Sequence, residues 1–222
     1  MERSRPPAAG HDHDTTRARV IQATLGCILD KGFYRASSNE IARRAGVSWG
    51  VIQHHFGTRE ALMVAAHRDG GALLEQLVEQ ADVGGEHVTE RLTRYWELLD
   101  SYYGRPEYLA RLQISLNLTR DPAVSAEAVA TIVETDERIR KRFVDLEHQV
   151  AGDCAAPPDT GFLFHTLRGL ALSHATLAGT TPAELKDRRH PEDRQTHARL
   201  LIAALARQFG GDAVSGDAVS DV

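Results

Sequence analysis

Hydrogen-bonding and basic side chains are concentrated between residues 37 and 59 of this 222-residue chain. Hydroxyl, amide, imidazole and guanidinium groups of this kind bind phosphate oxygens and base edges in nucleic acids. The chain contains no phosphate-binding glycine loop and no His-Glu-x-x-His zinc motif, so neither of these motifs supports an enzyme. The candidate DNA-binding residues are Ser37, Ser38, Asn39, Ser48, Trp49, Gly50, Val51, Gln53, His54, His55 and Arg59.

Helix start and stop signals divide this stretch into short helices. Ser37 and Glu40 have the spacing of a capping box, in which the serine caps the helix and the glutamate reaches back to it. Gly46 supplies a left-handed residue that ends this helix, and Ser48 caps the next, over residues 49–54. A short capped helix, a glycine turn and a second short helix form a helix-turn-helix, whose second helix enters the DNA major groove.

Gly50 breaks a local rule, because glycine inside a helix costs about 1 kcal/mol relative to alanine. One interpretation is that the missing side chain lets DNA approach the helix backbone closely. The other is that it only avoids a clash with a neighbouring helix.

Residues 19–62 resemble the DNA-binding region of tetracycline-repressor-like (TetR family) transcription regulators. The matching motifs are Gly32-Phe33, Ile41-Ala42, Ala45-Gly46-Val47-Ser48, His55-Phe56-Gly57 and residues 58–62. Gln53 stands where the family usually has tyrosine, and Trp49 where a polar or basic residue is common. The resemblance implies an all-α protein in which an N-terminal three-helix helix-turn-helix domain precedes a C-terminal helical ligand-binding and dimerisation domain, about nine helices in all.

Composition agrees with a globular regulator. The chain is 42% hydrophobic and 26% charged, and it has no apolar run long enough to span a membrane. Its N-terminus is not a secretory signal, and its two cysteines form no disulfide or metal framework, so we expect a cytoplasmic protein. The net charge is −5, yet residues 1–64 carry nine Arg and Lys against six Asp and Glu. A basic module on an acidic body suits a protein that presents one end to DNA.

The remaining pattern is helical throughout. We expect a disordered arm at residues 1–14, a helix-turn-helix domain at 15–64, a ligand-binding and dimerisation domain at 65–209 and a disordered tail at 210–222. The expected helices cover residues 16–31, 38–45, 49–54, 58–80, 86–103, 106–119, 123–151, 160–179 and 191–209, with a helical turn near 181–184. Gly70-Gly71 lies within one of them, either for tight packing or as a hinge.

The last two long helices are rich in apolar residues, which favours a homodimer built on a four-helix bundle, as the family resemblance also implies. The alternative is that residues 160–179 form the central core helix of a monomer. Aromatic residues elsewhere in the second domain suit the walls of a small-molecule cavity, although most would also suit an ordinary core. The candidate ligand-binding residues are Trp96, Leu99, Tyr103, Tyr108, Leu112, Asn117, Phe143, Phe162 and His165. No cofactor or metal site is expected.

These features predict a sequence-specific DNA-binding repressor that is released from a palindromic operator on double-stranded DNA by a small, largely apolar effector. In this hypothesis Ser37, Ser38, His54 and Arg59 hold phosphates, and the helix N-termini at Ser38 and Ser48 add backbone N–H donors. The residues facing base edges are Asn39, Trp49, Gly50, Val51 and Gln53. The departures at Trp49 and Gln53 leave one alternative open, a helical protein-interaction module that no longer binds DNA.

Overall fold

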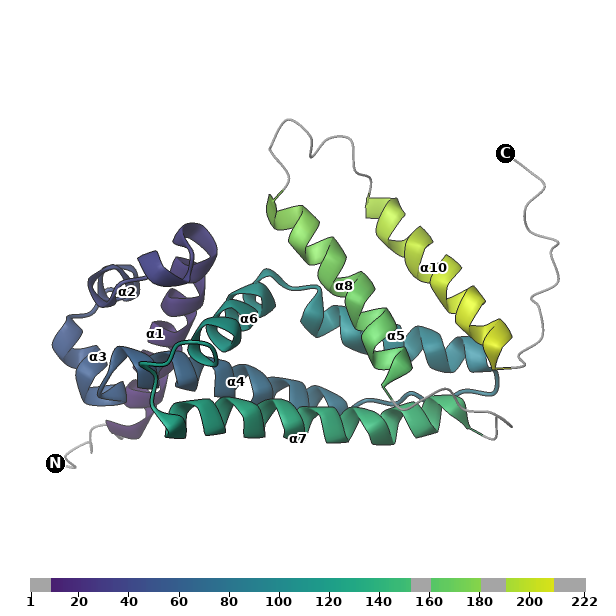
Figure 1. Ribbon diagram of the computed structural model, residues 1–222, viewed down its shortest axis with the longest axis horizontal. Helices are drawn as coiled ribbons and strands as arrows, with labels where there is room; N and C mark the ends of the chain where they lie inside the picture. Colours follow the sequence, from purple (N-terminus) through teal and green to yellow (C-terminus); the bar gives the residue numbers. More distant parts are fainter. Residues whose placement is uncertain (1–8, 153–160, 181–190, 210–222) are drawn as a thin grey trace, which may run out of the picture. The chain divides into compact units, whose positions relative to one another are not determined.

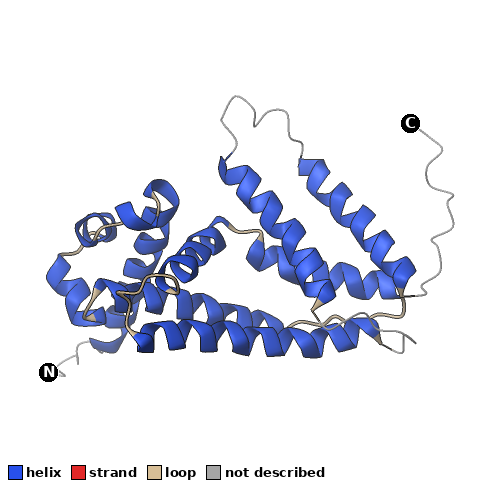
Figure 2. Cartoon of the chain, viewed as in Figure 1, coloured by secondary structure: helices blue, strands red, loops and turns tan. Residues whose placement is uncertain are grey.

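The computed structural model describes residues 9–152, 161–180 and 191–209, and all regular structure in these ranges is helical (Figure 1 and Figure 2). This confirms the expected all-α class. The elements are α1 (Ala9–Lys31), a short 3-10 helix η1 (Phe33–Arg35), α2 (Ser38–Ala45), α3 (Trp49–Phe56), α4 (Arg59–Glu79), α5 (Val88–Tyr103), α6 (Pro106–Leu118), α7 (Ala126–Ala151), α8 (Phe162–Thr180) and α10 (Pro191–Gln208).

The contacts divide the chain into two compact units, and the division cuts through three helices. One unit holds the described residues up to Gly71 together with residues 109–135, and the other holds residues 72–108 and those from Asp136 onward. The first unit therefore contains α6 residues and the start of α7 in addition to the expected helix-turn-helix. The functional boundary at residue 64 stays a prediction.

The core of the N-terminal unit forms around α1, whose apolar stripe recurs at helical spacing. Val20, Cys27 and Ile28 of α1 are fully buried, as are Ile41 of α2 and Ile52 of α3. Ile41 and Ile52 anchor the two short helices, because burying an aliphatic side chain stabilises by roughly 1.5–3 kcal/mol. Ala42 and Ala45 add to the buried face of α2. This core holds α2 and α3 at the surface of the unit.

In the C-terminal unit, α5 packs against both α8 and α10. Leu92, Tyr95 and Leu99 of α5 are fully buried there, with Phe143 of α7 and Leu167 of α8. α8 and α10 run side by side (Figure 1). α8 is buried on one side, at Leu163, Leu167 and Ala171, and exposed on another, at Phe162 and Leu177.

The helix ends differ from expectation mainly in α1. This helix begins at Ala9, so the expected disordered arm is wrong for residues 9–14. No proline or glycine falls between residues 11 and 25, and the helical hydrogen bonds therefore continue toward the N-terminus. The other observed ends lie within three residues of those expected. The expected turn at 181–184, the expected tail at 210–222 and residues 1–8 lie outside the described residues.

Gly70 lies inside the continuous helix α4 and makes room for a side chain from α6. A Cβ atom at this position would lie 2.0 Å from Nε of Arg111, which is buried and donates to the carbonyl of Ala66 at 3.4 Å. Tight packing therefore accounts for Gly70, and a hinge at Gly70-Gly71 stays a prediction.

Candidate nucleic-acid interface

Helix α2 begins and ends as its sequence predicts. The Ser37 hydroxyl accepts a hydrogen bond from the Glu40 N–H at 3.3 Å, and Gly46 adopts a left-handed conformation with φ 66°. The Val47 N–H then donates to the Ala42 carbonyl at 3.1 Å, which closes the C-terminal turn. These local bonds set the tight turn that carries the chain into α3.

The second half of the expected capping box does not form. The Glu40 carboxylate accepts from Arg43 at 2.6 Å and lies 2.8 Å from Nζ of Lys31, whereas the Ser37 N–H donates to the Arg35 carbonyl. Hydrogen bonds from Arg43 and Lys31 hold the pKa of Glu40 at about 2. The expectation that Glu40 reaches back is wrong, because two cations offer its carboxylate stronger, charge-assisted bonds.

Helix α3 is capped by Ser48, whose hydroxyl accepts from the Val51 N–H at 3.4 Å. It runs two residues further than expected and ends at Gly57, whose N–H donates to the Gln53 carbonyl at 2.8 Å. Ile52 is fully buried, whereas Gly50, Gln53 and His54 are exposed. One face of α3 anchors the helix and the other is open to solvent.

Residues 46–50 also spell Gly-Val-Ser-Trp-Gly, the Gly-x-Ser-x-Gly spacing of a hydrolase nucleophile. That motif requires a strand before the serine, but α2 precedes it here, and the Ser48 hydroxyl serves as a helix cap. The structural context therefore excludes a nucleophile elbow.

Gly50 faces open space. Apart from the helix's own backbone, a Cβ atom here would find only Oγ of Ser48 within 4 Å, at 3.7 Å. The glycine is therefore not needed to avoid a neighbouring helix. Of its two interpretations, the close approach of another molecule to the α3 backbone is the one that the geometry favours.

Arg59 has a different role from the expected phosphate contact. Its guanidinium donates to the Phe33 carbonyl at 2.7 Å and to the Ala36 carbonyl at 3.2 Å, and it lies 4.8 Å from the Phe33 ring centroid. Burial lowers the pKa of Arg59 from its ordinary value. These contacts tie η1 to the start of α4, so we assign Arg59 a structural role.

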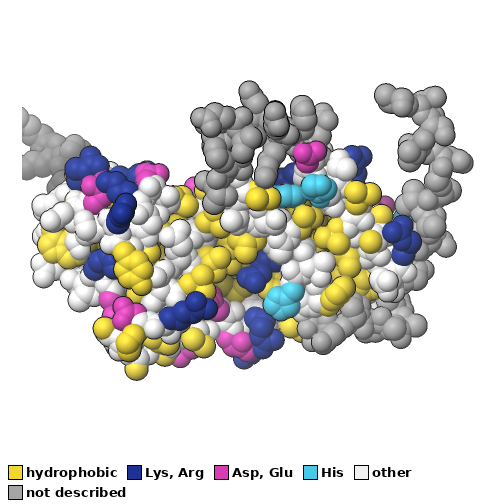
Figure 3. Space-filling view, turned by 45° about the horizontal axis from the view of Figure 1, so that its top comes forward, with side chains coloured by type: hydrophobic (Ala, Val, Ile, Leu, Met, Phe, Trp, Pro, Cys, Tyr) yellow, Lys and Arg dark blue, Asp and Glu magenta, His cyan; other side chains and the backbone are white. Residues whose placement is uncertain are grey.

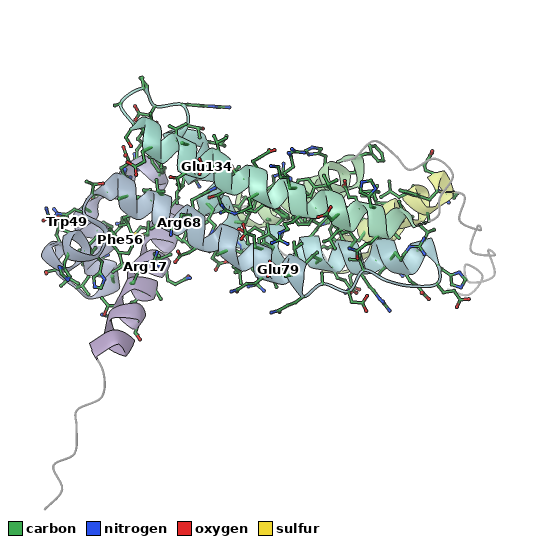
Figure 4. All side chains as sticks on the ribbon, turned by 90° about the horizontal axis from the view of Figure 1, so that it is seen from below. Arg17, Trp49, Phe56, Arg68, Glu79 and Glu134 are labelled. Carbon is green, nitrogen blue, oxygen red and sulfur yellow. The ribbon has the colours of Figure 1, made fainter. Side chains whose placement is uncertain are left out.

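The remaining DNA candidates divide by exposure. Asn39, Ser37 and Ser48 are exposed, whereas Ser38, Val51 and His55 are half-buried. Trp49 packs in part against the N-terminal core, so only part of its ring faces solvent. Figure 4 shows Trp49 at the start of α3 and Phe56 at its end, with Arg17 of α1 nearby; the Arg17 guanidinium lies 5.7 Å from the Phe56 ring centroid and pairs with Asp69.

Two exposed residues beside this surface were not predicted. Tyr34 is 78% exposed in η1, and its neighbour Arg35 is also exposed. The available signal was an aromatic and a basic residue shortly before the Ser37 cap. Both belong to the solvent-facing surface at the N-terminal end of α2.

The candidate ligand-binding residues do not form one site. Trp96, Leu99, Tyr103 and Phe143 share the C-terminal core, and Tyr108 packs against it. Leu112 and Asn117 belong to the other unit, where the Asn117 amide donates to a carbonyl of its own helix. Phe162 is exposed at the start of α8, and His165 is exposed as well. Sequence spacing could not separate these groups, because the division falls inside α6.

A small pocket of about 70 Å³ lies between α7 and α8. Two of the ligand-binding candidates, Phe143 and His165, line it together with Glu147, which was not predicted. The Glu147 carboxylate accepts hydrogen bonds from the N–H groups of Gly161 and Phe164, both at 2.6 Å. Burial and this nearby carboxylate raise the pKa of Tyr95 well above its ordinary value. The remaining lining residues are Arg140, Val144, Gly161 and Phe164.

Comparison with known proteins agrees with this geometry. The family model described as bacterial regulatory proteins, tetR family, matches residues 20–66, which span α1 to the start of α4. Residues 20–66 therefore carry the DNA-binding region of this family. HTH-type transcriptional regulator BetI 1 of Chromohalobacter salexigens is 38% identical over 77 residues, which are 32% of this chain and 38% of that protein. HTH-type transcriptional repressor AcnR of Corynebacterium glutamicum is 26% identical over 137 residues, 61% of this chain and 68% of that one.

The fold extends over most of the chain. A transcriptional regulator from Rhodococcus sp. Rha1 superimposes with a TM-score of 0.65 at 21% sequence identity, covering 89% of this chain and 98% of the other. The family and these relatives are transcription regulators, which agrees with the expectation of a protein that is not an enzyme. Within the described residues, no helix is long and apolar enough to cross a membrane, and no three His, Cys, Asp or Glu side chains are grouped to hold a metal ion.

Proposed function

We propose that this TetR-family regulator is a homodimeric repressor that binds a palindromic operator and is released by a small ligand. The observation that carries this proposal is the open face of α3. A helix anchored by buried Ile52 leaves Gly50 without a neighbour and exposes Gln53 and His54 beside it. That combination suits a helix whose backbone approaches DNA in the major groove.

We assign the contacts by chemistry. Exposed Ser37 and Ser48 cap helix N-termini, where backbone N–H groups and hydroxyls bind phosphate oxygens. The Gln53 amide matches the donor and acceptor pattern of adenine, and Val51 suits a thymine methyl group. Half-buried Trp49 then contributes through the exposed part of its ring.

We place the dimer interface on α8 and α10. Leu200 is 65% exposed on α10, and Phe162 and Leu177 are exposed on α8. Figure 3 shows hydrophobic side chains exposed on the part of the surface formed by these helices. Two such helices from each chain would bury these residues in a four-helix bundle. The two-fold axis would then set recognition helices roughly 34–36 Å apart, or a multiple of that.

The ligand response requires a molecule that binds one arrangement of the dimer more tightly than the other. The aromatic core around Tyr103, Phe143 and Phe164 offers an apolar lining for the body of such a molecule. We also propose that the regulator acts in the cytoplasm, where it would bind its operator DNA.

A gel-shift and footprinting experiment with the DNA upstream of the protein's own gene tests the proposal. We expect protection of a two-fold symmetric site whose half-sites are separated by about one helical turn or a multiple of it. Binding without sequence preference would refute the proposal. So would a footprint that persists when Gln53 and Gly50 are both replaced by leucine, because the open face of α3 would then not read the operator.

A further inference from the structure

Glu147 is a buried acid that forms no ion pair with any residue that the structure describes. Only 6% of this α7 residue is exposed. Among the described residues, no Lys, Arg or His nitrogen forms an ion pair with its carboxylate, whereas the more exposed acids Glu137 and Glu79 both pair with arginines. Burying a charge is costly unless it is compensated, so each of its contacts matters.

The start of α8 provides the compensation. The Gly161 N–H donates to Oε2 of Glu147 and the Phe164 N–H donates to Oε1, both at 2.6 Å, while the Tyr95 hydroxyl lies 3.5 Å from Oε1. The carboxylate therefore caps α8 from another helix, where the helix dipole favours negative charge. An ionised carboxylate has about four acceptor positions, so these contacts leave room for another donor.

Glu147 also lines the pocket between α7 and α8. The 70 Å³ space is lined by Glu147 and by the rings of Phe143 and Phe164, whose centroids are 4.6 Å apart. Since a water molecule occupies about 30 Å³ in the liquid, the space suits only a few heavy atoms. Aromatic faces attract cations, and a neighbouring carboxylate strengthens that preference.

Two basic residues, Arg140 and His165, also line the pocket, but Arg140 is already engaged. The Arg140 guanidinium donates to both carboxylate oxygens of Glu137, at 2.6 and 2.9 Å. His165 is exposed at the rim. The buried group with unused hydrogen-bonding capacity is therefore the acid.

We propose that this pocket binds the cationic head of a small ligand, an alkylammonium or amidinium group, with Glu147 as its anionic partner and Phe143 and Phe164 as its aromatic wall. This deepens the proposed ligand response and rests on it for its regulatory meaning, although the binding itself requires no DNA. Glu147 also caps α8, a helix at the proposed dimer interface. A bound cation therefore interacts with the same carboxylate oxygens that accept hydrogen bonds from the first turn of α8.

The amide groups of Gly161 and Phe164 report on this directly. The test is a ¹⁵N–¹H correlation spectrum of the full chain, titrated with ethylammonium chloride and, in parallel, with sodium chloride and sodium acetate at equal ionic strength. We expect saturable shifts of these two amides with ethylammonium only. Absence of a shift, or an equal shift with sodium chloride, overturns the proposal. A shift with acetate alone also overturns it, because an anion would then be bound by Arg140 and His165.

Three variants sharpen the result. Glu147→Gln should abolish the ethylammonium shifts, whereas Asp145→Asn, at an exposed acid on the same helix, should keep them. Since Glu147→Gln also weakens the α8 cap, Val144→Leu is the second test: it fills the pocket and leaves the cap intact. Circular dichroism checks the fold of each. Retention of binding by Val144→Leu would overturn the assignment of the pocket.

A parallel gel-shift separates this inference from the proposed function. Ethylammonium binding in a protein that binds no operator would overturn the repressor and leave the cation site standing. Operator binding without any ethylammonium shift would overturn the cation site and leave the repressor.

Discussion

Replacing Gly50 with alanine and with leucine separates the stability of the protein from its affinity for DNA. In the folded chain, a Cβ atom at this position has only Oγ of Ser48 within 4 Å beyond the helix's own backbone. Gly50→Ala therefore introduces no clash and removes a residue with poor helix propensity. Because the site is open, we expect a larger side chain at this position to leave the folded structure unchanged and to clash only with a bound molecule.

The expected magnitudes follow from these contacts. Glycine costs about 1 kcal/mol relative to alanine in a helix, so Gly50→Ala should raise the midpoint of thermal unfolding by roughly 2–4 °C in a chain of this size. If the α3 backbone contacts DNA closely, Gly50→Leu overpacks that contact by about 1–3 kcal/mol. That corresponds to a loss of operator affinity of roughly 5- to 150-fold.

Fluorescence anisotropy with labelled operator DNA measures the affinity, and calorimetry measures the stability. Ala130→Leu is the matched control, since it adds the same side chain at an exposed position of α7 in the same unit. It should leave DNA affinity unchanged. Destabilisation by Gly50→Ala would show that the site is not open, and unchanged affinity in Gly50→Leu would refute the close approach of DNA.

Four further substitutions test other parts of the structure. Arg59→Ala should lower the free energy of unfolding by roughly 1–3 kcal/mol, because two backbone carbonyls lose a charged donor. The salt dependence of DNA binding should stay unchanged. If Arg59 did bind a phosphate, its loss would reduce the slope of log affinity against log salt concentration by about 1. The pKa of Glu40 is about 2 in the folded chain and 4.5 ordinarily, so its contribution to stability is present above pH 4.5 and is lost as the pH falls toward 2. Glu40→Gln should remove that part of the pH dependence of stability. If the variant and the parent lost stability equally between those pH values, the ion pairs of Glu40 would be contradicted. Leu200→Glu should yield a folded monomer by analytical ultracentrifugation, and a persistent dimer would move the interface off this face of α10. Gly70→Ala should destabilise by about 1–3 kcal/mol through its clash with Arg111, and the additional change Arg111→Ala should relieve that clash; equal destabilisation in both backgrounds would refute it.

The sequence predicted the helix-turn-helix because its signals are local. Ser37, Gly46 and Ser48 act on backbone groups within five residues of themselves, and the structure places all three as expected. The same local reasoning failed for Glu40, where Lys31 from the preceding helix competes for the carboxylate. Local spacing shows which bonds a residue can form, and a partner from another helix decides which bond it does form.

The ligand-binding candidates illustrate the limit more clearly. Apolar and aromatic character marked Trp96, Tyr103 and Phe143 as inward-facing, and all three are buried. It could not show that Leu112 lies in the other unit, because both units draw residues from α6. Nor could it find Glu147, since a glutamate in an amphipathic helix has no sequence signal for burial.

The sequence by itself determined the all-helical class, the order of the helices and the capped turn that presents α3, because each depends on periodicity and on contacts within a few residues. Only the tertiary structure decided that Gly50 faces open space while Gly70 is filled by Arg111, and that Arg59 binds the carbonyls of Phe33 and Ala36. The same holds for the cap that Glu147 places on α8. The physical reason is distance along the chain: these contacts join residues 14–41 positions apart, and no local pattern specifies which helices pack together.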